Sequence, residues 1–188
     1  MNKLLLLISL LVFTAVTVQA ATRVEMKTSM GTITLELNEE QAPISVKNFL
    51  AYAEQNLYDG TIFHRVINNF MIQGGGFDKS LQRKQTRPPI KNEAGNGLPN
   101  VKGSIAMART NVVDSATSQF FINLKDNAFL NQRGQSPSMY GYAVFGKVVA
   151  GMEIVEKIGK VRTIAKSNSM GDYPEPQVII ESVRRVSE

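Results

Sequence analysis

Two segments of the sequence, 63–75 and 118–122, mix strand-like apolar residues with a long polar side chain that has no acidic neighbour. On a β-strand, side chains two residues apart share a face, so a polar donor should lie beside an apolar side chain at three places. The three pairs are Phe63 with Arg65, Met71 with Gln73, and Gln119 with Phe121. This pattern indicates non-covalent chemistry, in which a cleft binds a ligand through hydrogen bonds beside an apolar wall.

The apolar members of these segments are also typical of a hydrophobic core. Phe63, Phe70, Met71 and Phe121, taken singly, fit a barrel interior as well as a binding site. Arg65 favours the cleft, because an arginine inside a barrel would lack a partner, whereas at an outward cleft it could meet a ligand. The residues alone leave both interpretations open.

Several chemistries lack the residues that they need. The chain has no cysteine and His64 is its only histidine, which excludes disulfides, cysteine-based zinc sites and thiol nucleophiles and leaves only carboxylates for a metal. A hydrolase built from Ser118, His64 and Asp126 would lack the Gly-x-Ser-x-Gly turn that exposes the nucleophile. We therefore expect no metal, and a structural or supporting role for His64.

Two glycine-containing motifs also fail as nucleotide sites. Residues 141–147 match the start of a phosphate loop, but Val148 stands where a magnesium-binding Ser or Thr is needed. The Asn96-Gly97 run lacks the third glycine of a dinucleotide fingerprint and predicts a turn. The net charge of +5 is spread along the chain, which favours a solvated surface over nucleic-acid binding, although a polyanion binder stays an alternative.

The length of 188 residues predicts one domain, and the first twenty residues have the pattern of an export signal. Lys3, the apolar stretch 4–18 and the end at Ala20 have the three parts of a secretory signal peptide, with an uncleaved anchor as the alternative. We expect cleavage after Ala20, a mature domain over 21–188, and no stable membrane insertion afterwards. The mature chain is expected outside the cytoplasm.

Alternation and turn signals predict a mainly β protein with two separated helices. The expected helices cover about 43–53 and 152–158, and the expected strands lie at 24–37 (a hairpin), 62–66, 70–73, 104–108, 119–123, 142–149 and 177–186. A closed antiparallel barrel with helices over its two ends fits this order, because closure removes the sheet edges. Residues 77–99 form a long irregular stretch, which raises the hypothesis that they gate or extend a cleft.

The sequence resembles the cyclophilin peptidyl-prolyl isomerases. The segments 63–75 and 118–122 look like signature blocks of that family, and the similarity continues through 104–109, 128–130 and 142–149 in the same order. Together with the signal sequence, the chain is most similar to the periplasmic cyclophilins of Gram-negative bacteria. The resemblance implies an eight-stranded barrel capped by two α-helices, with a substrate cleft on its outer face.

The resemblance also implies roles for individual residues. The family's catalytic arginine falls on Arg65, with Gln73 and Phe70 beside it in the catalytic group. The proline pocket falls on Phe70, Met71, Phe121 and Leu130, the peptide-backbone contacts on Gln73, Ala108 and Arg109, the supporting polar residue on Gln119, and the rim on Phe129 and Tyr142. Phe129, Tyr142 and Arg109 stand where many eukaryotic members carry tryptophan, histidine and asparagine, so we expect only weak inhibition by cyclosporin.

The activity implied is rotation about X-Pro peptide bonds, with no cofactor and no covalent intermediate. The expected partners are proline-containing segments of unfolded or partly folded exported proteins, and the expected state is a periplasmic monomer. A chaperone module that binds proline peptides in the same cleft without catalysis is the alternative.

Overall fold

The computed structural model describes residues 21–166 and 171–186, and its chain opens with the expected β-hairpin. β1 (Arg23–Thr28) pairs with β2 (Gly31–Leu37) in antiparallel register. Every second residue of both strands is buried, as the alternation of apolar residues predicts. The hairpin therefore turns one face to the core and the other to solvent.

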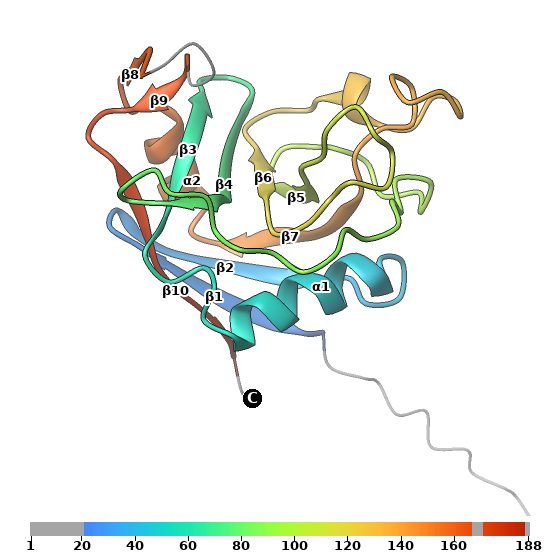
Figure 1. Ribbon diagram of the computed structural model, residues 1–188, viewed down its shortest axis with the longest axis horizontal. Helices are drawn as coiled ribbons and strands as arrows, with labels where there is room; N and C mark the ends of the chain where they lie inside the picture. Colours follow the sequence, from blue (N-terminus) through green and yellow to red (C-terminus); the bar gives the residue numbers. More distant parts are fainter. Residues whose placement is uncertain (1–20, 167–170, 187–188) are drawn as a thin grey trace, which may run out of the picture.

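Six more strands close this hairpin into a barrel. They are β3 (Thr61–Ile67), β4 (Met71–Asp78), β5 (Ser104–Met107), β6 (Phe120–Asn123), β7 (Val144–Ala150) and β10 (Val178–Arg185). Within the described residues the order around the barrel is β1-β10-β3-β4-β6-β5-β7-β2, antiparallel at every pairing (Figure 1). The expected closed eight-stranded barrel is confirmed.

Two helices cover the barrel, also as expected. α1 (Pro43–Glu54) begins with proline in its first turn and sends Phe49 into the interior, where its ring lies 5.1 to 5.7 Å from the rings of Tyr58, Phe120 and Phe145. α2 (Met152–Gly159) follows β7 and buries Val155 and Ile158 in the same core. Neither helix of the described chain is long and apolar enough to cross a bilayer.

A second, smaller pairing was not predicted from the sequence. β8 (Thr163–Ile164) and β9 (Tyr173–Pro174), which follow α2 and precede β10 in the sequence, form a separate two-stranded sheet (Figure 1). Two-residue strands leave no detectable alternation, so sequence periodicity cannot find them. The amide of Val66 on β3 donates to the carbonyl of Asp172 (2.9 Å), which joins this sheet to the barrel.

One expected boundary is wrong. The strand predicted at 70–73 was expected to end at the glycine triplet, but β4 begins at Met71 and continues through the glycines to Asp78. The strand continues through the glycines because it stays paired with β3 up to Asp78, and side chains packed beside it leave little room for a Cβ. A Cβ on Gly76, for example, would lie 2.6 Å from the Cδ atom of Gln119.

Candidate active site

An open cleft lies on the outer face of the barrel, where β3, β4 and β6 meet the loops that follow β5 and β6. Its volume is about 600 Å³. The lining residues are His64, Arg65, Phe70, Met71, Gln73, Phe77, Arg83, Ala108, Arg109, Gln119, Phe121, Leu130, Tyr142, Gly171 and Asp172. The structure thus brings together ten of the eleven residues that the sequence singled out, all except Phe129.

The floor of one half of the cleft is apolar. Met71, Phe121 and Leu130 are buried there in a small cluster outside the barrel core, and Phe70 packs against it. The ring of Tyr142 meets that of Phe121 edge to face at 5.6 Å. This half offers a dry, shaped surface for a small apolar ring.

Phe129 belongs to the outer edge of this apolar half. Its ring stacks on Phe70 with the centroids 5.7 Å apart, but 54% of the residue is exposed and it does not line the cleft itself. It follows Ala128 in a single 3-10 turn, η1 (Ala128–Leu130), whose other end delivers Leu130 to the floor. Phe129 therefore lies at the outer edge of the apolar half, while Leu130 of the same turn lies in its floor.

Arg65 and Phe63 do not share a face, contrary to the expectation from their spacing. Phe63 is fully buried in the barrel core, whereas Arg65 lines the cleft. The reason is a bulge in the pairing of β3 with β4, where Phe63 faces Gly74 and Arg65 faces the adjacent Gln73. The additional residue on β3 is His64, so both His64 and Arg65 face the cleft.

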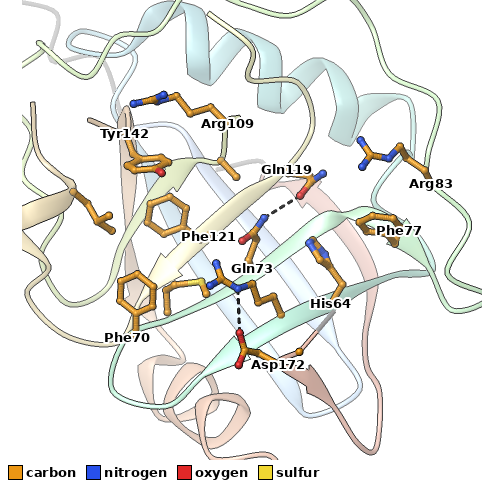
Figure 2. Close-up of a pocket in the computed structure, with 15 residues that line it drawn as sticks. His64, Phe70, Gln73, Phe77, Arg83, Arg109, Gln119, Phe121, Tyr142 and Asp172 are labelled. Carbon is orange, nitrogen blue, oxygen red and sulfur yellow. Dashed lines mark hydrogen bonds and ion pairs between the residues drawn. The ribbon is translucent and has the colours of Figure 1, made fainter. Parts of the chain in front are cut away.

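The guanidinium of Arg65 is held by one carboxylate. Its Nε donates to Oδ2 of Asp172 at 3.3 Å, the pair drawn as a dashed line in Figure 2. Among the described residues no other side chain or carbonyl accepts a hydrogen bond from this guanidinium. Its two terminal nitrogens therefore remain available to a ligand. Nothing in the sequence indicated Asp172, which lies 107 positions away.

Gln73 and Gln119 form a polar bridge across the middle of the cleft. The side-chain amide of Gln73 donates to Oε1 of Gln119 at 3.0 Å (Figure 2). The two other expected pairs, Met71 with Gln73 and Gln119 with Phe121, do share the cleft face. The backbone of Ala108 completes this region, because its amide donates to the carbonyl of Gln119 at 3.0 Å.

Arg109 is engaged by the loops around it. Its Nε, Nη1 and Nη2 donate to the carbonyls of Gly141 (2.9 Å), Thr110 (2.9 Å) and Pro137 (2.7 Å). Its guanidinium carbon also lies 4.9 Å from the ring centre of Tyr142. The side chain therefore fastens two loops and the ring of Tyr142 to the edge of the cleft. Arg109 is at the expected place, with its charge directed at protein carbonyls.

His64 lines the other half of the cleft, beside Phe77. The two rings lie 4.8 Å apart, and Nδ1 of His64 is buried with no hydrogen-bond partner in the described part of the chain. Burial, and then the positive charges of Arg65 and Arg83, lower the pKa of His64 to about 4. The ring is therefore neutral at physiological pH. Phe77 and Arg83 were not predicted as cleft residues, because they lie in and just after the unexpected end of β4.

The residues of the hydrolase and phosphate-loop patterns have structural roles in the barrel. The hydroxyl of Ser118 is buried and donates to the carbonyl of Gly75 at 2.8 Å, so it is not paired with His64 as a nucleophile. Residues 144–147 of the apparent phosphate motif lie in β7. Within 21–166 and 171–186, no three His, Cys, Asp or Glu residues gather as metal ligands. What the cleft offers is an arginine donor beside an apolar floor.

Comparisons with known proteins agree with this geometry. Residues 23–185 match the family model described as cyclophilin type peptidyl-prolyl cis-trans isomerase/CLD. The chain is 53% identical over 167 residues to peptidyl-prolyl cis-trans isomerase A of Dickeya dadantii, an alignment that covers 87% of this chain and 84% of the relative. It is 52% identical over 160 residues to peptidyl-prolyl cis-trans isomerase B of Escherichia coli, with 85% and 97% covered.

Solved structures show the same architecture. A cyclophilin-type peptidyl-prolyl cis-trans isomerase of Cryptosporidium parvum matches with a TM-score of 0.71 and 25% identity, over 90% of this chain and 99% of that chain. A second structure of that protein, determined in the presence of the dipeptide Ala-Pro, matches with a TM-score of 0.70 and 26% identity, over 88% and 99% of the two chains.

Proposed function

Because the chain belongs to the cyclophilin-type peptidyl-prolyl cis-trans isomerase family, we propose that its outer cleft is where X-Pro bonds rotate, with Arg65 as the central catalytic residue. The family makes the chain an isomerase that acts on proline-containing peptides. The observation that carries the assignment of the site is a guanidinium beside a buried apolar floor, with no hydrogen-bond partner for its terminal nitrogens among the described residues.

The reaction needs no covalent step. An X-Pro bond has nearly balanced cis and trans forms, and the barrier of about 20 kcal/mol between them comes from amide resonance. Such a barrier allows roughly 0.01 events per second, so a rate of about a thousand per second requires a reduction of roughly 7 kcal/mol. The cleft must therefore bind the twisted amide more tightly than the planar one.

Arg65 can supply much of that difference. In the planar amide the proline nitrogen shares its lone pair with the carbonyl, whereas in the twisted amide the pair is localised and accepts a hydrogen bond. A donor at that nitrogen stabilises the twisted transition state and not the planar ground state. A single well-placed donor is worth about 3 to 4 kcal/mol in comparable sites. The guanidinium suits this role because it stays charged and is rigidly forked.

The apolar half and the glutamine bridge would do the rest. The floor of Phe70, Met71, Phe121 and Leu130 receives the proline ring in our assignment, and a dry environment disfavours the more dipolar planar amide. Gln73, held by Gln119, would bind the backbone on one side of the bond while the other side rotates. Ala108 and Arg109 offer further backbone contacts, and Phe129 and Tyr142 would close the rim.

Exchange spectroscopy on a short X-Pro peptide tests this assignment. We expect Arg65→Ala to reduce the acceleration of cis/trans exchange by two or more orders of magnitude, because it removes the donor. Arg23→Ala is the control, because this substitution removes the same charge from a residue on β1 that does not line the cleft. Wild-type turnover by folded Arg65→Ala would contradict the role. Peptide binding without any acceleration by the parent would instead indicate a non-catalytic proline-binding chaperone module.

We further propose that the enzyme acts on exported proteins in the periplasm, as a monomer. Residues 1–20, which carry the signal pattern, lie outside the described residues, and the first barrel strand begins at Arg23, after the expected cleavage site. Removal of the signal would therefore leave every described strand intact. Amino-terminal sequencing of the protein from a periplasmic fraction should begin at Ala21, and sedimentation analysis tests the monomer.

A further inference from the structure

The half of the cleft that lies across the glutamine bridge from the apolar floor has no role in the proposed function. Figure 2 shows His64, Phe77 and Arg83 on one side of Gln73 and Gln119, with Phe70, Phe121 and Tyr142 on the other. A proline ring occupies only the apolar half, yet the cleft is continuous over about 600 Å³. A peptide bound through its proline therefore has neighbouring residues that can reach the second half.

Arg83 is held in this half by its backbone. The chain turns back after β4, so that Arg83 forms a bridge with Phe77 and the amide of Lys84 donates to the carbonyl of Gly76 at 3.0 Å. The guanidinium carbon lies 5.3 Å from the ring centre of Phe77, at the distance of a cation–π contact. The ring thus supports the side chain of Arg83 at the wall of the cleft.

The charge of Arg83 is not neutralised by the protein. In the part of the chain that the structure describes, no carboxylate forms an ion pair with Arg83. The nearest acidic residue in sequence, Asp78, instead accepts hydrogen bonds from the amides of Ser80 (2.8 Å) and Gln82 (3.0 Å) in the turn. Asp172, the only carboxylate among the described residues that line the cleft, is paired with Arg65. The second half therefore presents an uncompensated cation beside a neutral His64.

From this arrangement we propose that the half of the cleft lined by His64, Phe77, Arg83 and Gln119 is a subsite for a carboxylate, namely an aspartate or glutamate side chain near the proline of the client. Guanidinium groups bind carboxylates through paired, charge-assisted hydrogen bonds, and the contact with Phe77 holds the exposed guanidinium of Arg83 beside the cleft. The subsite rests on the proposed function, because it presupposes that the proline occupies the apolar half.

Turnover of matched peptides tests the proposal. The peptides carry glutamate or glutamine at positions one to three residues before or after the proline, with both ends blocked, and kcat/KM is measured at low salt. At one or more positions we expect glutamate to be preferred about fivefold. Arg83→Gln should abolish that preference. Arg87→Gln should keep it, because Arg87 is exposed in the same segment but does not line the cleft.

The single histidine gives an independent readout. A carboxylate bound at Arg83 should raise the pKa of His64, followed by NMR, because it offsets the positive charge that lowers that pKa. Arg83→Gln should also raise the pKa of His64, and Arg87→Gln should leave it unchanged. A glutamate peptide that is turned over faster without moving this pKa would overturn the subsite.

The remaining outcomes separate the two proposals. If neither peptide of a pair is isomerised, the proposed function fails. If both are isomerised equally at every position, only the subsite fails. Equal loss of the preference in Arg83→Gln and Arg87→Gln would assign it to the general field of the protein and overturn the subsite. A preference seen only with an unblocked peptide ending after the proline would assign the site to a C-terminal carboxylate instead of a side chain.

Discussion

His64 lies between the barrel interior and the cleft, and only 7% of the residue is exposed. Its position follows from the bulge in β3, which inserts one residue between the core residue Phe63 and the cleft residue Arg65. Protonation there would place a positive charge in a desolvated site near Arg65 and Arg83, which is why its pKa falls to about 4. Between the two pKa values His64 is therefore neutral in the native protein and protonated in the unfolded chain.

This difference predicts a specific pH dependence of stability. In the unfolded chain the histidine pKa is about 6.5, so between pH 6.5 and 4 the unfolded state binds more protons and native stability falls as the pH falls. The loss from His64 should reach about 3 kcal/mol at pH 4 and vanish above pH 7. His64→Gln removes this contribution, so its stability curve, measured by denaturant unfolding at each pH, should be flatter over that range. Parallel curves for the two proteins would contradict the assignment.

The bulge also marks how far sequence reasoning can place single residues. Strict alternation correctly put Met71 with Gln73, and Gln119 with Phe121, on the cleft face, because those stretches pair regularly. The same rule failed for Phe63 with Arg65, because a bulge depends on the partner strand. Asp172 could not be predicted at all, since its contact with Arg65 depends on how a distant hairpin docks.

The β8–β9 hairpin carries that contact and acts as a bracket for Arg65. The backbone bond from Val66 to Asp172 fixes the hairpin against β3, so the carboxylate of Asp172 is held next to Arg65 without ordering a long flexible side chain. Occupying Nε leaves the terminal nitrogens of the guanidinium to face a peptide. The ion pair is about half exposed, so its energetic value is small and its main effect is on orientation.

Asp172→Ala should lower kcat/KM about three- to fivefold, mainly through kcat, because Arg65 then samples unproductive orientations. Glu175→Ala is the matched control, since Glu175 pairs with Arg162 at 3.0 Å in the same region and does not line the cleft. The Nε–H resonance of Arg65 should shift in Asp172→Ala alone. If the kcat of Asp172→Ala equals or exceeds that of the unsubstituted enzyme, the ion pair does not position Arg65 productively.

The elements themselves were largely predictable, and the exceptions have a common cause. Apart from the end of β4, both helices and the barrel strands were expected within a few residues of their observed bounds, since amphipathic period and turn residues are local signals. The continuation of β4 through its glycines and the β8–β9 pairing depend on partners far along the chain. Glycine is a weak strand former alone, but here the pairing with β3 keeps the strand going, and a Cβ at Gly76 would displace the side chain of Gln119.

The whole molecule is tied together by residues 79–103, the irregular segment that separates β4 from β5. Arg83 of this segment lines the cleft, so the segment extends that site. Extending the cleft was one of the two roles hypothesised for residues 77–99. Farther along, the backbone amide of Arg87 donates a hydrogen bond to the hydroxyl of Tyr52 on α1. The side-chain amide of Asn96 donates to the carbonyl of Val144 on β7. Figure 1 shows the segment running alongside α1. One segment thereby connects the cleft, a barrel strand and the helix that covers the core.

Glu93 connects the same segment to the start of α1 through three hydrogen bonds. Its two carboxylate oxygens accept hydrogen bonds from the amides of Ile44 (3.0 Å) and Ser45 (2.7 Å), and from the hydroxyl of Ser45 (2.7 Å). No side chain of the helix's own N-cap, Ala42, can do this, so a carboxylate from 48 residues away satisfies the first amides. Its negative charge also complements the positive end of the helix dipole.

Glu93→Gln should therefore loosen the segment and the helix together. The neutral amide keeps one acceptor oxygen and presents an NH2 group to the other helix donors, so we expect the free energy of unfolding to fall by about 1 to 2 kcal/mol. Hydrogen exchange should quicken both in α1 and in residues 79–103, because each holds the other in place. Glu181→Gln, an exposed change of the same charge on β10, should do neither. Faster exchange in α1 alone would show that the segment is held by its other bonds, and that Glu93 serves only the helix.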